Sequence, residues 1–414
     1  MDLFFNTQIK IGIYIAKPLA GSRTYSIQNI PFGLKAIIKE LNKSIYNYQY
    51  CNDKNYNNFD FILYSVNSEK DYLILIRDFY KKQVKPKIIV GGSDIINLFL
   101  LRDVVDIQVI GRAEGQINDI IKGMEFTNVW RKENDYNIEK KYTIRQPQYL
   151  LSVGNKCEHN VGCNFKCKFC QYGNKFPLFI KNLGYNSGQD ERELMFKDIN
   201  WNLAKSRVVT SIDGSTENSR ILVNKKLSNE RIISKITEAY KVKTQSPLLL
   251  SVYNIIGYPW ENESTANLEE ILYFLKQADK QKKTHKIWID FKFNHFIPML
   301  LTPFEKKSMN IINFRELIFS KFSNDLYKGN NIEAKIFNGF PSAQKTADRL
   351  YVYRSFDIDE HIIEMTKNKY YINSMNERFD KLKEYKILRD VQKLPSYPII
   401  NSFEKTEERG QKIK

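Results

Sequence analysis

Short apolar runs alternate with amphipathic segments over the first 125 residues of the chain. The apolar runs are rich in β-branched residues and end at Pro, Gly or charged positions, which is typical of buried strands. They lie at 10–16, 59–66, 85–92 and 105–111. Between them, residues 29–44 and a segment that begins at Glu69 carry apolar side chains at helical spacing. This alternation predicts a parallel sheet with helices on both faces.

Ligands of such sheets bind beyond the carboxyl ends of the strands. Here these ends carry Ser65, the glycine-containing segment 91–94 and the segment 111–115. We therefore expect residues 1–125 to form one α/β domain whose ligand edge is built from these three positions.

A polar, irregular stretch at 126–147 separates this half from a second α/β region and is predicted to be a linker, with or without one short strand. Six further strands are predicted at 149–153, 194–199, 207–213, 248–256, 287–296 and 333–338. Helical patterns at 229–242 and 265–281 lie between them, so residues 148–345 resemble part of a (β/α) barrel. Residues 346–414 are predicted to be a polar, helical extension with a frayed tail.

Composition narrows the class of protein. Of the 414 residues, 42% are hydrophobic, which is enough for a large core and excludes disorder along the whole chain. The longest apolar run, 95–101, is much shorter than the ~20 residues that a membrane-spanning helix needs. The first residues lack the basic region and cleavage site of a secretory signal, so we expect a cytoplasmic protein without a membrane partner.

The formal net charge of +17 allows two interpretations. A basic excess of this size can mark a nucleic-acid partner. It can also reflect the Lys-, Asn-, Ile- and Tyr-rich usage of an AT-rich genome, because the basic residues are interleaved with acidic ones. Both interpretations stay open.

Four of the five cysteines lie within fourteen residues, and three of them, Cys163, Cys167 and Cys170, have the spacing C-x3-C-x2-C. Thiolates are soft ligands that favour iron–sulfur clusters, zinc or copper(I). Three thiolates on a cluster with four irons leave one iron open, as a catalytic metal site requires. The alternative is a structural zinc site, with Cys157 or His159 as fourth ligand, in a nucleic-acid-binding module.

The segment C-x3-C-x-Phe-C resembles the signature of the radical S-adenosylmethionine (radical SAM) superfamily. The resemblance implies that Cys163, Cys167 and Cys170 hold a 4Fe–4S cluster and that Phe169 lies against the adenine of SAM. It also implies that reductive cleavage of SAM gives methionine and a 5′-deoxyadenosyl radical that abstracts hydrogen from the substrate. An electron donor such as flavodoxin or ferredoxin would then be a partner.

Three later segments resemble other motifs of this superfamily. After the strand at 207–213, the resemblance implies that Glu217 contacts the amino group or ribose of SAM and that Arg220 contacts its carboxylate. The same residues also fit a capped helix N-terminus. In 248–264, Gly257 and Pro259 resemble the adenine-binding turn. The segment 294–307 resembles the ending of a sixth strand. The interval from Cys170 to Glu217 is short for two βα units, which predicts a reduced barrel.

The N-terminal half resembles the Rossmann-like (flavodoxin-like) cobalamin-binding domain that precedes many radical SAM barrels. The cobalt-ligating Asp-x-His-x-x-Gly motif is missing, because no histidine precedes His159. The domain either lacks cobalamin and acts as a scaffold, or binds it without a lower ligand and supports radical methylation. The substrate is expected to be a small molecule, a nucleotide or a base in nucleic acid. His295 is a candidate for proton transfer, and Cys51 is expected to be a buried hydrophobe.

Overall fold

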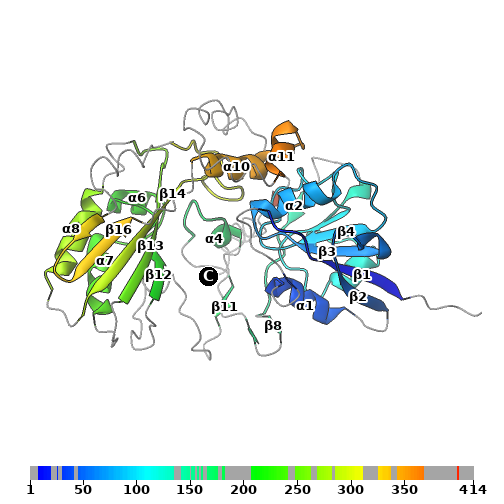
Figure 1. Ribbon diagram of the computed structural model, residues 1–414, viewed down its shortest axis with the longest axis horizontal. Coiled ribbons are helices and arrows are strands. Elements are labelled where there is room, and N and C mark those ends of the chain that lie inside the picture. Colours follow the sequence, from blue (N-terminus) through cyan, green and yellow to red (C-terminus); the bar gives the residue numbers. More distant parts are fainter. Residues whose placement is uncertain are drawn as a thin grey trace, which may run out of the picture.

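The computed structural model describes seventeen stretches of the chain. They are 8–19, 26, 30–41, 45–134, 141–149, 151–153, 156–157, 160–161, 166–175, 180–181, 207–240, 248–262, 268–281, 285–310, 325–336, 343–367 and 399–400. Within them the chain builds two main sheets, each accompanied by helices (Figure 1). The protein is therefore an α/β protein, as the alternating pattern predicts, and it contains antiparallel as well as parallel strand pairs.

The N-terminal sheet has six strands in the order β2-β1-β3-β4-β5-β6. Its strands are β1 (Ile9–Tyr14), β2 (Tyr46–Cys51), β3 (Phe61–Ser65), β4 (Lys87–Gly91), β5 (Ile107–Val109) and β6 (Val129–Arg131). All neighbours pair in parallel except β5 and β6, which are antiparallel. The first five strands have the order 2-1-3-4-5 of doubly wound, flavodoxin-type sheets.

Helices α1 (Phe32–Glu40), α2 (Glu69–Phe79) and α3 (Ile117–Ile121) accompany this sheet. One apolar core joins α1 and α3 to residues such as Ile11, Leu63 and Ile89, and a second core joins α2 to the opposite faces of the strands. Strands covered on both faces are nearly continuous in apolar residues, which explains why the sequence pattern located them.

The second sheet has five strands in the order β12-β13-β14-β16-β15. Its strands are β12 (Arg207–Ser211), β13 (Leu248–Ile256), β14 (Ile287–His295), β15 (Asp325–Lys328) and β16 (Ile332–Ile336). The first four in this order run parallel, and β15 closes the edge as an antiparallel strand. Helices α7 (Asn229–Ala239) and α8 (Glu269–Asp279) pack on one face and enclose a single apolar core.

The remaining described elements are short. They are η2 (Tyr56–Asn58), η3 (Lys132–Asn134), β7 (Tyr142–Thr143), β8 (Ser152–Val153), β9 (Lys156–Cys157), β10 (Asn160–Val161), α4 (Gln171–Lys175), β11 (Ile180–Lys181), α6 (Glu217–Leu222), α10 (Ala343–Arg354), α11 (Glu360–Met365) and β17 (Ile399–Ile400). Figure 1 shows α4 between the two sheets. Helices α10 and α11 lie along one edge of the molecule, at the top of this view.

The structure differs from the sequence-based expectations in several places. The edge strands β2 and β15 were not predicted, and the segment expected to be a linker with room for one short strand contains two, β6 and β7. In 149–153 only Ser152–Val153 is strand, and it pairs antiparallel with β9. The extension expected to be helical contains β17, which pairs with β7. The strand predicted at 194–199 and the tail after 400 lie outside the described residues.

No helix within the described stretches combines the length and the apolar character that a bilayer crossing requires.

Candidate functional site

Asn174 of α4 stabilises the described part of the cysteine loop, which is residues 166–170. The main-chain N–H of Cys170 donates to the carbonyl oxygen of Cys167 at 2.9 Å. The Asn174 side-chain amide then donates to both of these carbonyls, at 2.9 Å for Cys167 and 2.8 Å for Cys170. Cys167 is buried and Cys170 is half-buried, and α4 begins directly after Cys170. Cys163 lies outside the described residues.

Main-chain hydrogen bonds attach this loop to the second half of the chain. Lys168 donates its N–H to the carbonyl of Val223 at the end of α6, at 2.9 Å. Its own carbonyl accepts from the N–H of Phe304 at 3.2 Å, and the Gln171 amide donates to the Leu300 carbonyl at 3.3 Å. The loop therefore lies between α6 and the segment that follows β14.

Phe169 packs against a group of aromatic side chains at the end of β13. Its ring centroid lies 6.2 Å from that of Tyr258, and the Tyr258 ring stacks on Trp260 at 5.0 Å. Phe296 and Phe304 complete the cluster. Burial raises the pKa of Tyr258 well above its usual value, so this phenol stays protonated. Its hydroxyl donates to the main-chain oxygen of Asp213 at 2.9 Å.

The turn after β13 needs glycine at position 257. Gly257 has φ +80°, and a Cβ there would lie 2.4 Å from the main-chain oxygen of Asn310. One carboxylate oxygen of Glu261 accepts the N–H groups of Gly257 and Tyr258, at 2.8 and 3.2 Å. Burial raises the pKa of Glu261, against the effect of these bonds. Pro259, which lies between Tyr258 and Glu261 in the sequence, is half-buried, and its carbonyl accepts from the Asn310 side chain at 3.2 Å.

Glu217 opens α6 and is half-buried. Thr216 caps this helix by accepting the N–H of Ser219 at 3.1 Å, as the capping interpretation of the sequence predicts. The Glu217 carboxylate accepts the N–H of Asn229 at 2.7 Å. The Ser219 hydroxyl donates to Glu261 at 2.8 Å, which connects the start of α6 to the turn after β13.

Arg220 is completely buried and directs its guanidinium to protein acceptors. It donates to the carbonyls of Leu227 at 2.8 Å, Gly214 at 2.9 Å and Ser215 at 3.4 Å, and to the side-chain oxygen of Asn229. Burial lowers its pKa to about 10, and nearby glutamates oppose this shift. The guanidinium remains charged at neutral pH and fixes the loops before and after α6.

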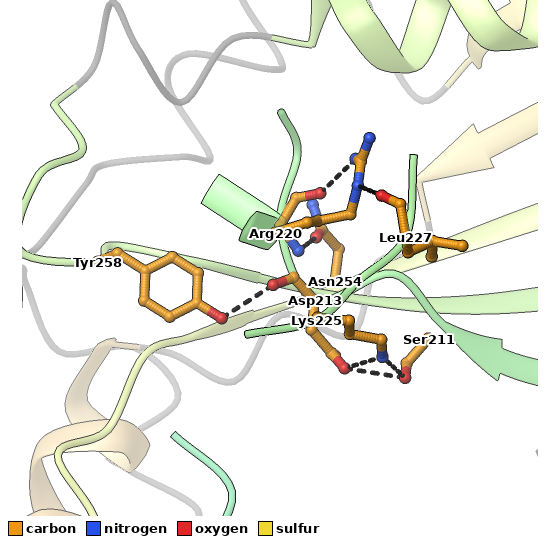
Figure 2. A network of polar contacts seen from close by, with 8 residues as sticks. Ser211, Asp213, Arg220, Lys225, Leu227, Asn254 and Tyr258 are labelled. Atoms are coloured by element: carbon orange, nitrogen blue, oxygen red, sulfur yellow. Dashed lines mark hydrogen bonds and ion pairs between the residues drawn. The ribbon is translucent and has the colours of Figure 1, made fainter. Parts of the chain in front are cut away.

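A second polar group supports the same turn (Figure 2). Asn254 in β13 accepts the N–H of Gly214 at 2.7 Å and donates to the Ser215 hydroxyl at 2.8 Å. The buried ammonium of Lys225 pairs with the Asp213 carboxylate, and both contact the Ser211 hydroxyl. Asp213 itself has φ +50°, a left-handed conformation that this network stabilises.

The structure thus brings the described predicted residues into one connected region. Phe169 lies between Cys167 and Cys170 and packs on Tyr258 in the turn after β13, and Ser219 joins that turn to the helix of Glu217 and Arg220. His295, which pairs in register with Ile256, has a ring atom 3.5 Å from the place a Gly257 Cβ would take. Sequence reasoning missed Asp213, Lys225 and Asn254. A buried polar residue inside the apolar run of β13 was the one local signal for Asn254.

The N-terminal sheet contributes a separate cavity of about 340 Å³ at the carboxyl ends of β3, β4 and β5. Its inner wall is apolar and includes Leu63, Ile89 and Val109. Ser65 and the ion pair between Arg112 and Glu114, 3.1 Å apart, lie at its polar side. Tyr172 of α4 also lines it, two residues after Cys170. The predicted ligand edge therefore faces the helix of the cysteine loop.

The donor set fits a thiolate-held group. Cys167 and Cys170 are three residues apart on one turn, and neither forms a disulfide in the described part of the chain. Among the described residues no group of three or more His, Cys, Asp and Glu side chains is placed to hold a metal ion, and Cys163 is not one of these residues. Cys51 is buried in the N-terminal core, as expected, and burial raises its pKa to about 12.

Comparisons with known proteins give no family assignment. No family model matches the sequence, and no curated protein matches it. One similar solved structure is the radical S-adenosylmethionine methyltransferase TsrM from Kitasatospora setae, with cobalamin and a 4Fe–4S cluster bound. Its identity is 12% and its TM-score 0.29, over 73% of this chain and 61% of that chain.

A second similar structure is the cobalamin-dependent S-adenosylmethionine radical enzyme OxsB with aqua-cobalamin bound. Its identity is 12% and its TM-score 0.27, over 99% of this chain and 62% of that chain. The chain thus spans less than two thirds of the length of either protein. Likeness at this level leaves the function of this chain to be argued from its own residues.

Proposed function

We propose that this chain is a radical SAM enzyme with a flavodoxin-type N-terminal domain and a shortened barrel. In this proposal Cys163, Cys167 and Cys170 hold a 4Fe–4S cluster. Such a cluster, when reduced by an electron donor, would supply the electron for the reductive cleavage of SAM, the chemistry by which hydrogen would be removed from the substrate. The substrate is a small molecule or a nucleotide.

The observation that carries the proposal is the contact between Phe169 and the turn of Gly257. Cysteine spacing alone is compatible with zinc. A structural zinc loop needs no glycine turn from a distant strand beside it, whereas a nucleotide cofactor needs a surface against which its base can lie. Phe169 lies 6.2 Å, between ring centroids, from Tyr258, which directly follows Gly257, and this closeness to the cysteines supports an adenine site there.

The protein groups have separate tasks in this proposal. Phe169 and Gly257 bound the adenine, with Pro259 fixing the backbone of the turn. Glu217, half-buried at the positive end of α6, takes the ammonium group of SAM. Arg220 holds the turn that presents Glu217, since its guanidinium already has four acceptors. Direct contact of Arg220 with the SAM carboxylate is the alternative role.

Metal content after anaerobic purification tests the proposal. We expect a brown protein with about four irons and about four sulfides per chain. Alanine variants of Cys167 or Cys170 should lose most of both, while Cys51→Ala, a change at a buried cysteine outside the loop, should retain them. A colourless protein with one tightly bound zinc would contradict the proposal and support a zinc-stabilised nucleic-acid-binding module.

The N-terminal cavity favours a second candidate, a cobalamin-dependent radical SAM methyltransferase. Its apolar inner wall and its position at the carboxyl ends of a flavodoxin-order sheet suit the tail of a large cofactor. Incubation with hydroxocobalamin followed by desalting tests this candidate. A retained corrin spectrum, with about one equivalent bound, supports it. Complete loss of the corrin on desalting would contradict it and support the first candidate, in which the N-terminal domain lacks cobalamin.

A further inference from the structure

Lys175 is a buried cation that none of the roles above uses. It ends α4, five residues after Cys170, and only 1% of its surface is exposed. Its ammonium donates to the main-chain oxygen of Ser93 at 2.7 Å. Burial lowers its pKa to about 8, and the charge of Asp94 opposes this shift. A buried lysine is costly, so its partners must compensate for the lost hydration.

The partner of Lys175 belongs to the ligand edge of the N-terminal sheet. Ser93 follows β4 and lines the cavity, together with Gly91 and Gly92. The backbone there is tightly confined, because a Cβ on Gly92 would lie 2.2 Å from the carbonyl oxygen of Val66. A bond to the Ser93 carbonyl therefore joins α4 to a rigid wall of the cavity.

Asp94 connects the same loop to the C-terminal helix α10. Its carboxylate accepts the Tyr353 hydroxyl at 2.9 Å, and its main-chain oxygen accepts the Tyr72 hydroxyl at 2.7 Å. Three residues further, Asn97 donates to the carbonyls of Val352 and Ser355, both at 2.8 Å. The loop that receives Lys175 is thus held by contacts with both α2 and α10.

Several attachments of α4 and the cysteine loop reach the second half of the chain. Gln171 reaches Leu300, and Lys168 reaches Val223 and Phe304, all in the second half of the chain. On the side of the cavity, α4 is attached by the Lys175 ammonium, by a bond from the Gln146 amide to the Lys175 carbonyl at 3.0 Å, and by the packing of Tyr172 against the N-terminal core. The ammonium is the charged group among these contacts, so removing it would loosen this end of α4 while the other end stays attached.

We propose that Lys175 is a positioning residue that fixes the cysteine loop against the ligand cavity of the N-terminal sheet. Through α4 it sets the place of Cys170 and of Tyr172, so that the thiolates and the cavity act as one composite site. The consequence for cluster geometry rests on the proposed function, whereas the mechanical role of Lys175 does not.

The test compares Lys175→Met with Lys235→Met. Lys235 is a matched control, because it is also a fully buried lysine, paired with Glu238 at 2.7 Å on α7 of the other sheet. Iodoacetamide labels the metal-free full chain, and peptide mass spectrometry follows Cys170, with buried Cys51 as internal reference. Global unfolding would raise labelling at both cysteines, whereas local release of α4 would raise it at Cys170 alone.

We expect Lys175→Met to speed Cys170 labelling by about tenfold or more relative to Cys51, as the loss of a buried charged hydrogen bond implies. Lys235→Met should leave that ratio at the wild-type value, and Lys175→Arg should restore it in part. Equal ratios in wild type and Lys175→Met would overturn the proposal. If Lys175→Met does not fold, Lys175→Arg decides, because even a retained cation with altered reach should move the ratio.

The iron-loaded chain gives a second readout. The electron paramagnetic resonance spectrum of the reduced cluster should change in Lys175→Met and not in Lys235→Met. If wild type binds no iron, the proposed function fails, and the labelling ratio still decides the role of Lys175. If wild type binds iron and neither readout responds to Lys175→Met, the positioning role fails alone.

Discussion

Replacing Arg220 by methionine is expected to lower the free energy of unfolding by about 3–5 kcal/mol, because it leaves buried carbonyl groups without their donor. Methionine fills much of the same space but donates no hydrogen bond. The carbonyls of Gly214 and Leu227, now served at 2.9 and 2.8 Å, would lose their partner. Chemical denaturation monitored by circular dichroism measures this loss.

Two further variants serve as controls for that measurement. Arg231→Met changes a half-buried arginine on the neighbouring helix α7 and should cost less than about 1 kcal/mol. Arg220→Lys keeps the charge but cannot reach all four acceptors, and should give an intermediate loss. A stability of Arg220→Met equal to that of wild type would show that this guanidinium does not hold the loops, and would return Arg220 to the role of a direct SAM ligand.

Gly257→Ala is expected to lower the free energy of unfolding by about 2–4 kcal/mol, from the left-handed backbone and from overpacking against the neighbouring chain. The new Cβ would meet the main-chain oxygen of Asn310 at 2.4 Å, and Asn310 is held in turn by the Gly257 carbonyl at 2.9 Å. The turn cannot yield without moving both segments. Thermal unfolding of the two proteins measures the difference.

Gly33→Ala is the matched control for this substitution. Gly33 lies in α1, and a Cβ there meets no heavy atom within 4 Å. Alanine should therefore leave stability unchanged or raise it by roughly 0.5–1 kcal/mol, because it favours the helix. If both alanine variants behave alike, the turn at Gly257 is not the close approach described here.

Periodicity located the strands that bury at least one face completely. β3, β4, β13 and β14 have continuous or alternating apolar character, so their sequences carry a strong local signal. The edge strand β2, with sequence YNYQYC, is mostly exposed and polar in its middle, and β6 has three residues. Such strands are defined by their neighbours, which a local pattern does not contain.

The residues of the candidate site likewise fall into those that a local sequence pattern predicts and those that only the fold brings together. The cysteine spacing and the glycine turn are local patterns, and the prediction of the candidate site rests on them. The pairing of Lys225 with Asp213 and the bond from Lys175 to Ser93 join residues that are far apart in the sequence or belong to different elements. A lysine in a polar helix is ordinarily exposed, so nothing in the sequence distinguished Lys175 before the fold placed it inside.

Production of 5′-deoxyadenosine tests the central claim most directly. The anaerobic, iron-loaded chain is mixed with SAM and dithionite, and the nucleoside is quantified by chromatography. We predict that wild type and Cys51→Ala release 5′-deoxyadenosine and methionine in equal amounts and only when dithionite is present. Cys167→Ala should release neither above background. Release by Cys167→Ala at the wild-type rate, or none by an iron-loaded wild-type chain, would contradict the account.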